Sequence, residues 1–151
     1  MTLKEGDKAP DFKLGGDDGK AHALGEFKGK YLVLYFYPRD DTPGCTIEAK
    51  GFTERIGEIK KLGADVVGIS DDQYESHCRF RDKYGLKVLL LSDPMHKTIE
   101  AYGAWGNRGV FGVGTIRTTF VLGKDARILK IFEKVRPDGH PQEIIDFLKT
   151  I

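Results

Sequence analysis

The sequence contains few cysteines and no long apolar segment. Among 151 residues there are two cysteines, Cys45 and Cys78, and no CxxC pair. Two thiols are too few for a disulfide framework, and without a Cys/His cluster no zinc site is expected. No apolar run approaches the roughly 18 residues of a membrane span, and the N-terminus MTLKEGDKAPDF lacks the apolar core of a secretory signal. We therefore expect a soluble, cytoplasmic protein with no membrane partner.

The sequence also lacks an excess of charge of either sign. It has 24 Lys and Arg residues against 23 Asp and Glu residues, for a formal net charge of +1. A chain so balanced offers no basic surface for nucleic acid, so no nucleic-acid partner is expected. Its length is that of about one domain, which can bury roughly two thirds of its unfolded surface. We predict a single domain over residues 1–151.

The apolar pattern predicts alternating strands and helices. Continuous apolar runs at 31–38, 64–70 and 87–93 indicate buried strands. Helices are predicted at 46–62, from a cap at Asp71 or Asp72 to Tyr84, at 96–102 and at 141–151. Hairpins are predicted within 11–24, with a turn at 15–20, and between 117–123 and 126–134, and the glycine-rich stretch 103–115 predicts a loop. This order predicts an α/β, thioredoxin-like sandwich, a central mixed sheet flanked by helices, with an N-terminal β-hairpin extension.

The stretch YFYPRDDTPGCTIEAKGF places Cys45 where a strand ends and a helix begins. A thiol is nucleophilic as the thiolate, and the unpaired N–H groups and positive dipole end of a helix N-terminus favour that form. Pro43 and Gly44 restrict the turn and remove bulk from it. Thr42 adds a hydroxyl that can donate to and accept from a bound oxygen species. The pattern favours a nucleophile for a small polar substrate over a buried filler.

The same stretch resembles a known family. Pro38, Thr42 and Cys45 match the PxxxTxxC active-site motif of peroxiredoxins, and FYPRDDTPGCTIEA resembles the peroxiredoxin Q, or bacterioferritin comigratory protein, subfamily. The blocks GDKAPDFKL, VVGIS, ESHCRFRDKYGL, LLSDP, YGAWG and RTTFVLG agree in order and spacing, so the resemblance covers nearly the whole chain. It implies a thiol-dependent peroxidase for antioxidant defence that needs neither an organic cofactor nor a metal.

The resemblance also implies roles for single residues. Cys45 would attack hydrogen peroxide or an alkyl hydroperoxide and become a sulfenic acid. Arg117 occupies the position of the family's active-site arginine, and a guanidinium there can stabilise both the thiolate and the leaving oxygen. Thr42 would hold the peroxide, and Pro38 would shield the site from water.

The second cysteine departs from the commonest family pattern. Many peroxiredoxin Q proteins carry it five residues after the first, where this chain has Lys50. Others carry it in the next helix, near Arg81, and Cys78 lies one turn earlier. The resemblance therefore implies that Cys78 resolves the sulfenic acid as an intramolecular disulfide, after local unfolding, and that thioredoxin or a similar dithiol reduces the product. It also favours a monomer.

Other interpretations stay open from the sequence. The chain could be a one-cysteine peroxidase with a structural Cys78, or a non-catalytic binding or holdase module on the same fold. The missing CxxC opposes a disulfide reductase. Asp40 and Asp41 are expected to form the turn or cap the helix, and Trp105 either covers the site or packs structurally. Solvated or capping roles are expected for His22, His77, His96 and His140, with His77 also placed as a base beside Cys78.

Overall fold

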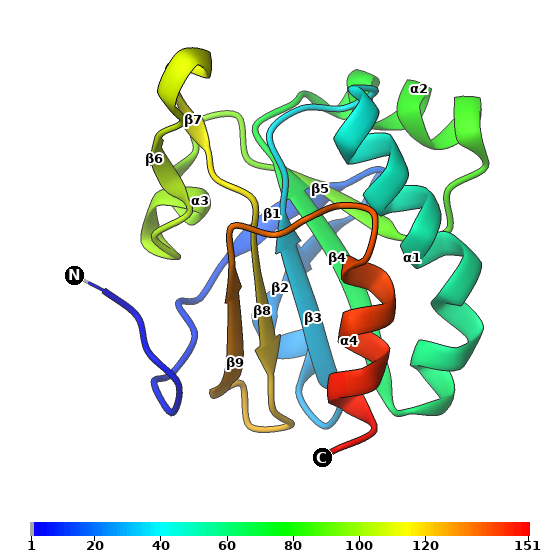
Figure 1. Cartoon of the computed structure of the whole chain (residues 1–151), viewed down its shortest axis with the longest axis vertical. Coiled ribbons are helices and arrows are strands. Elements are labelled where there is room, and N and C mark those ends of the chain that lie inside the picture. The colour runs from blue at the N-terminus through cyan, green and yellow to red at the C-terminus, as the bar shows by residue number, and fades with distance from the viewer. Residues whose placement is uncertain (1) are drawn as a thin grey trace.

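A seven-stranded mixed sheet lies at the centre of the computed structural model, which describes residues 2–151. Its strand order is β2-β1-β5-β4-β3-β8-β9 (Figure 1). The strands are β1 (Lys13–Gly16), β2 (Ala21–Ala23), β3 (Tyr31–Phe36), β4 (Ala64–Ser70), β5 (Leu89–Ser92), β8 (Thr118–Leu122) and β9 (Ile128–Glu133). The helices are α1 (Pro43–Lys61), α2 (Tyr74–Tyr84), α3 (Lys97–Ala101) and α4 (His140–Leu148), with a short 3-10 turn, η1 (Leu24–Phe27).

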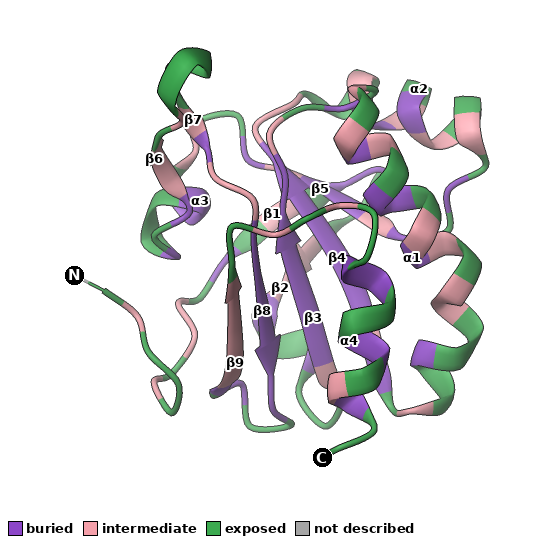
Figure 2. Cartoon of the chain, in the orientation of Figure 1, coloured by how far each residue is buried: buried purple, intermediate pink, exposed green. Residues whose placement is uncertain are grey.

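The central strand β3 is buried on both faces, as its continuous apolar sequence predicts (Figure 2). Val33 and Tyr35 pack into one cluster with side chains of α1, α2 and α4. Leu32 and Phe36 alternate with them and pack into a second cluster with side chains of η1 and α3. Helices therefore cover both faces of the sheet.

Strand directions confirm the predicted thioredoxin-like sandwich. β3 pairs in parallel with β4, and β4 with β5, whereas β8 pairs antiparallel with β3 and with β9. Because the parallel strands β3 and β4 end at the same edge, the loops that follow them lie side by side. The β3–α1 loop thus lies next to the β4–α2 loop, and this edge carries the predicted nucleophile.

The N-terminal hairpin is confirmed, but Gly15 and Gly16 belong to β1 rather than to the turn. They pair with Ser92 and Leu91 of β5, so the hairpin forms one edge of the main sheet. The close packing of Gly16 explains its residue type, because a Cβ there would lie 2.7 Å from an Asp18 oxygen.

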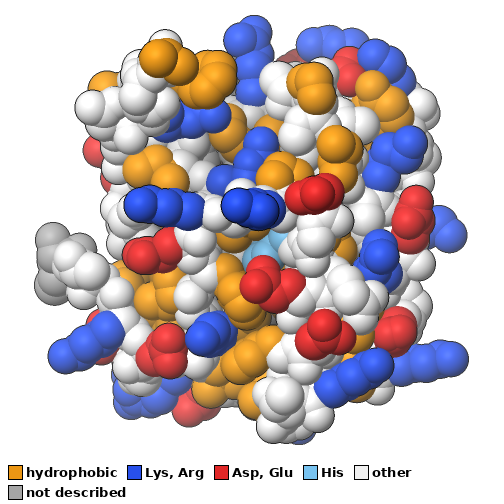
Figure 3. Space-filling view, in the orientation of Figure 1, with side chains coloured by type: hydrophobic (Ala, Val, Ile, Leu, Met, Phe, Trp, Pro, Cys, Tyr) orange, Lys and Arg blue, Asp and Glu red, His pale blue; other side chains and the backbone are white. Residues whose placement is uncertain are grey.

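The glycine-rich stretch 103–115 is not simply a loop, and that prediction was wrong. β6 (Trp105–Asn107) and β7 (Val113–Thr115) pair antiparallel around a 3-10 turn, η2 (Gly109–Phe111). The strands are only three residues long, too short for an alternating pattern to stand out among glycines. Three exposed apolar side chains, Val110, Phe111 and Val113, lie at the tip of this hairpin. Hydrophobic side chains gather at the surface in this region, at the top left of Figure 3.

Helix starts also differ from the sequence prediction. Helix α1 begins at Pro43, three residues earlier than predicted, because proline is favoured at the first helical position. Helix α2 begins at Tyr74 with Gln73 as its N-cap residue, so neither Asp71 nor Asp72 caps it. Gly85, at a φ of 63°, ends α2 as predicted. Among residues 2–151 we find no helix with the length and apolar character needed to cross a membrane.

Candidate active site

Cys45 is the third residue of helix α1 and its side chain is only 1% exposed. The first amides of a helix have no partner within it. The N-cap residue Thr42 leaves them uncapped, because its hydroxyl donates to the Arg39 carbonyl at 2.8 Å and makes no capping hydrogen bond. The amides near Cys45 are therefore placed to donate to an oxygen ligand.

Arg117 reaches the sulfur from the start of β8. Its Nη2 donates to Cys45 Sγ at 3.4 Å, and its Nη1 donates to Glu48 Oε1 at 3.1 Å. A Cβ on Gly44 would lie 2.9 Å from the same Nη2, so the approach of the guanidinium depends on a glycine there. The structure thus brings together two residues that are far apart in the sequence, and it places the positive charge of Arg117 beside the Cys45 sulfur.

Glu48 is a site residue that the sequence analysis missed. It is fully buried beside Arg117, and its second carboxylate oxygen, Oε2, has no hydrogen-bond partner among residues 2–151. Burial raises the pKa of Glu48 to about 7, although the charge and hydrogen bond of Arg117 oppose the shift. Glu48 lies three residues after Cys45, on the same helix face, and this spacing was the signal that could have identified it.

Pro38 lies on the wall of a groove of about 640 Å³ next to the β3–α1 loop. Trp105 and Arg108 of the β6–β7 hairpin also line this groove. Trp105 is half-buried and stacks on His96, with ring centroids 3.9 Å apart and planes inclined by 5°. Trp105 therefore has a packing role and also borders the groove beside Pro38.

Cys78 lies on helix α2 and is far from Cys45. Its Sγ is 3.6 Å from the carbonyl oxygen of Asp17, which directly follows β1, whereas Cys45 contacts Arg117, which directly precedes β8. Four strand spacings separate β1 from β8, or about 19 Å across the sheet. Both cysteines are free, and the structure does not bring them together.

The helix face that carries Cys78 is well defined. Arg81, one turn later, donates from Nη1 to the same Asp17 carbonyl at 2.6 Å. Cys78 and Arg81 therefore lie on one face of α2, at its border with β1. His77 points elsewhere, into the core, so the interpretation of His77 as a base beside the Cys78 thiol is wrong.

Two of the four histidines are buried, which contradicts the expected solvated roles for them. His77 and His140 are 0% and 1% exposed, respectively. His140 hydrogen-bonds through Nε2 to Thr119 Oγ1 at 2.8 Å and through Nδ1 to Glu143, and burial lowers its pKa. His22 and His96 pair with carboxylates near the surface.

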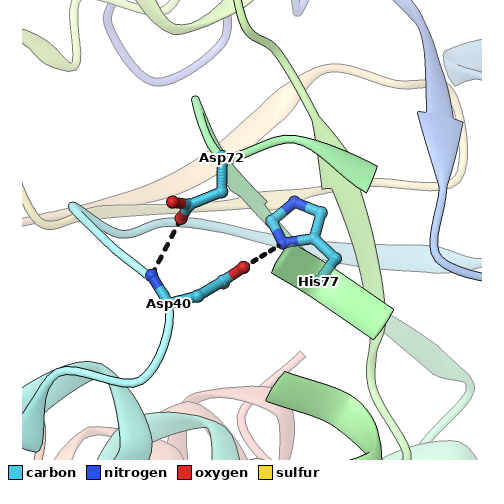
Figure 4. Close-up of side chains that lie close together, drawn as sticks. All are labelled: Asp40, Asp72 and His77. Atoms are coloured by element: carbon cyan, nitrogen blue, oxygen red, sulfur yellow. Dashed lines mark hydrogen bonds and ion pairs between the residues drawn. The ribbon is translucent and has the colours of Figure 1, made fainter. Parts of the chain in front are cut away.

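Asp40 and Asp41 do more than shape the turn. Asp41 adopts a φ of 59° and accepts hydrogen bonds from Lys83 Nζ and Tyr84 Oη at the end of α2. Asp40 is buried and hydrogen-bonds to His77 (Figure 4). Oxygen and nitrogen atoms of Asp40, Asp72 and His77 lie within 4.8 Å of one another, a spacing that metal ligands share. Those atoms are already hydrogen-bonded among themselves, so geometry alone assigns no metal here.

Comparisons with known proteins agree with this geometry. The protein-family model described as the AhpC/TSA family matches residues 5–131. Peroxiredoxin Bcp of Bacillus subtilis is 43% identical over 154 residues, covering 100% of this chain and 98% of that protein. Peroxiredoxin Bcp of Escherichia coli is 39% identical over 150 residues, covering 97% of this chain and 96% of that protein.

Solved structures show the same likeness in three dimensions. A PrxQ cysteine-to-serine mutant from Xylella fastidiosa superposes with a TM-score of 0.95 at 28% identity, covering 99% of this chain and 98% of that one. The bacterioferritin comigratory protein of Xanthomonas campestris gives a TM-score of 0.88 at 32% identity, covering 92% and 90%. Since the family model matches most of the chain and relatives above 30% identity align over their full length, the chain belongs to the AhpC/TSA family and is a peroxiredoxin of the Bcp group, a thiol peroxidase.

Proposed function

We propose that Cys45 is the peroxidatic cysteine and that Arg117, Thr42 and Pro38 complete its pocket. The observation that carries this assignment is the hydrogen bond from Arg117 Nη2 to Cys45 Sγ at 3.4 Å. A guanidinium at that distance stabilises a thiolate and can hold the peroxide oxygen on which charge develops.

The first step is attack of the Cys45 thiolate on one peroxide oxygen. The S–O bond forms as the O–O bond breaks, the leaving oxygen takes up a proton as water or alcohol, and Cys45 becomes a sulfenic acid. The uncapped amides of the α1 N-terminus are placed to donate to the peroxide. The Thr42 hydroxyl gives its proton to the Arg39 carbonyl, so its oxygen is placed to accept a hydrogen bond from the peroxide. Pro38 limits access of water from the adjoining groove.

The substrate class follows from the family and from the site. Peroxides are the oxidant, and hydrogen peroxide and alkyl hydroperoxides both offer the O–O bond that the thiolate needs. The alkyl peroxide reduction activity attributed to the Xanthomonas campestris protein supports the second class. The exposed Val110, Phe111 and Val113 give the neighbouring hairpin an apolar tip.

The resolving step is assigned to Cys78. Its thiol attacks the Cys45 sulfenic acid, the two sulfurs join, and water leaves. Cys78 shares its helix face with Arg81, where relatives of this type carry their second cysteine. Cys78 contacts Asp17 beside β1 and Cys45 contacts Arg117 beside β8, and these two strands lie four strand spacings, about 19 Å, apart in the sheet. The ends of α1 and α2 must therefore unfold locally before the two sulfurs meet.

A thiol reductant then returns the enzyme to its starting state. We assign thioredoxin or a similar dithiol protein to this step, since a disulfide is reduced by thiol–disulfide exchange. We further propose that residues 1–151 act as a single-domain monomer in the cytoplasm. Analytical ultracentrifugation of the reduced and oxidised protein checks the oligomeric state.

The alternative is a one-cysteine peroxidase with a structural Cys78, and the wide separation of the two thiols favours it. Peroxide consumption by wild type, Cys45→Ser and Cys78→Ser, with thioredoxin and its reductase, distinguishes the two. Activity lost in both variants supports Cys78 as resolver, and loss only in Cys45→Ser assigns a one-cysteine enzyme. Turnover by Cys45→Ser would contradict the proposed nucleophile.

Mass spectrometry after one equivalent of peroxide gives the direct test of resolution. We expect an intact monomer with a Cys45–Cys78 bond. A persistent sulfenic acid at Cys45 would reject the assignment of Cys78.

A further inference from the structure

The strongest feature outside the peroxide pocket is a buried ion pair between the β3–α1 loop and helix α2. Asp40 lies five residues before Cys45, and His77 directly precedes Cys78 in sequence. Their side chains are 3% and 0% exposed, and His77 Nδ1 lies 2.6 Å from Asp40 Oδ2 (Figure 4). The pair therefore joins the two segments that carry the two cysteines.

The hydrogen-bond partners of His77 favour its cationic form. Its Nε2 lies 3.0 Å from the Leu91 carbonyl oxygen, which can only accept, so Nε2 carries a proton. Asp40 already accepts from Tyr37 Oη at 2.6 Å and from Ser76 Oγ at 2.8 Å, as a carboxylate does. We therefore assign Asp40 as the carboxylate and His77 Nδ1 as the donor to it, which makes His77 an imidazolium.

A second contact ties the same loop to the strand that precedes α2. The Asp40 amide donates to Asp72 Oδ2 at 2.8 Å, and Ser70 Oγ donates to the same oxygen at 2.7 Å. The loop is thus held both by its backbone and by its side chain.

We propose that the Asp40–His77 pair is a latch that holds the β3–α1 loop and α2 in the closed, peroxide-reactive arrangement and sets the rate at which these two segments open for disulfide formation. This role rests on the proposed function of Cys78. Asp40 and His77 are positioning residues, since neither contacts the Cys45 sulfur. Weakening the latch speeds resolution and shortens the life of the sulfenic acid.

The latch is pH-dependent. Burial by itself lowers the pKa of His77, but the hydrogen bond and charge of Asp40 outweigh it, so the pKa of His77 is raised above 6.5. The latch is intact below pH 6.5 and is lost as the pH rises through that raised pKa. Other charged groups around the pair are Asp72 on the β4–α2 loop and those lining the adjoining groove, Arg39, Asp41, Arg79, Asp82 and Lys83.

A matched control exists on the same two segments. Lys83 Nζ and Asp41 Oδ2, 2.8 Å apart, also join α2 to the β3–α1 loop, but their side chains are 58% and 41% exposed. An exposed pair contributes little to stability. Lys83→Gln therefore breaks a tie between the same elements without touching the buried latch.

The test is amide hydrogen exchange of the reduced, full-length protein as wild type, Asp40→Asn, His77→Gln and Lys83→Gln. Loss of a charged hydrogen bond of this kind should raise the amide exchange rates of residues 38–48 and 74–84 by about tenfold or more in both latch variants. The core of β3 and β4 should exchange at unchanged rates, and Lys83→Gln should match wild type within about twofold. Equal acceleration of the β3 and β4 core, or no acceleration at all, would overturn the latch.

The pH profile separates a latch from a merely structural contact. After correction for the intrinsic pH dependence of exchange, residues 38–48 and 74–84 of wild type should exchange faster as the pH rises above 6.5. The His77→Gln variant should not show this increase. Imidazole ¹⁵N shifts should show the His77 cation at pH 6.5 and below. A neutral ring there, or an unchanged profile in His77→Gln, contradicts the inference.

Chemistry then links the latch to turnover. After one equivalent of peroxide, the Cys45 sulfenic acid should convert to the disulfide about tenfold faster in Asp40→Asn than in wild type. If wild type forms no Cys45–Cys78 bond, the proposed function of Cys78 fails, whereas the exchange data still decide whether Asp40 and His77 hold the loop closed.

Discussion

The buried carboxyl of Glu48 makes the sharpest prediction, through Glu48→Gln. Glutamine keeps an oxygen for Arg117 Nη1, but it cannot ionise. Burial raises the pKa of Glu48 from an ordinary 4.5 to about 7, so the folded protein holds a proton that the unfolded chain releases between these pH values. Stability from this group is therefore complete below pH 4.5 and is lost as the pH rises to about 7.

The magnitude follows from proton linkage. A tenfold change in proton affinity corresponds to about 1.4 kcal/mol, so ionisation of Glu48 destabilises the fold by about 3 kcal/mol. Glu48→Gln removes this loss. The unfolding free energy of the variant, relative to wild type, should therefore rise by about 3 kcal/mol between pH 4.5 and pH 8.5.

Urea denaturation of both proteins across that pH range measures the difference. Contributions from His77, His140 and the other titrating groups cancel, since both proteins contain them. Glu54→Gln is the control, because Glu54 lies on the same helix with its side chain 70% exposed. Its unfolding free energy relative to wild type should change by no more than about 0.5 kcal/mol across the same pH range. A Glu48→Gln difference that is flat with pH would refute the buried, proton-binding carboxyl.

The remaining predictions concern glycines and one hydroxyl. Gly44→Ala should push Arg117 from the sulfur, because the new Cβ would lie 2.9 Å from Nη2, and peroxide consumption should fall about tenfold with little change in melting temperature. Gly68→Ala should destabilise the fold by at least about 1–3 kcal/mol in urea, because its Cβ would lie 2.7 Å from the Tyr35 ring. Gly57→Ala, with open space around it on α1, should instead stabilise by about 0.5–1 kcal/mol. Tyr35→Phe removes a buried hydroxyl without a partner among residues 2–151 and should be neutral or stabilising by up to about 1 kcal/mol.

The sheet could be predicted from the sequence wherever burial imposes a pattern. β3 and β4 are buried on both faces, so their composition alone marks them as strands. The β6–β7 pair could not be predicted, because its six residues include two glycines and a half-buried Trp105 that stacks on His96. The β6–β7 pair therefore forms because of tertiary contacts rather than because its residues favour strands.

The pocket shows the same division between local and tertiary information. Glu48 was open to prediction, since three residues along a helix bring it to the face of Cys45. The contact between Arg117 and Cys45 is different, because it requires β8 to pair antiparallel with β3, and no spacing in the sequence encodes that pairing. Only resemblance to a family could place Arg117 at the sulfur.

Helix α2 explains why the second cysteine was the hardest residue to place. Consecutive helical residues point about 100° apart, so His77 enters the core while Cys78 points toward β1. Cys78 and Arg81 nevertheless contact the same Asp17 carbonyl. Cys78 therefore lies on the same face of α2 as Arg81, the position near which related proteins carry their second cysteine, although it comes one turn earlier. The position of Cys78 on α2 is thus compatible with its proposed attack on the Cys45 sulfenic acid. The separation of the two cysteines across the sheet is the remaining obstacle to that attack.

In the proposed mechanism the two cysteines have opposite physical requirements. Cys45 needs fixed partners, because Arg117 and the helix amides act only when they are already aimed at the reacting atoms. Cys78 needs access to a distant sulfur, which a rigid structure denies. The Asp40–His77 latch satisfies both requirements. It holds the pocket closed while it is intact, and its two residues lie on the β3–α1 loop and α2, the two segments that must separate before the disulfide forms.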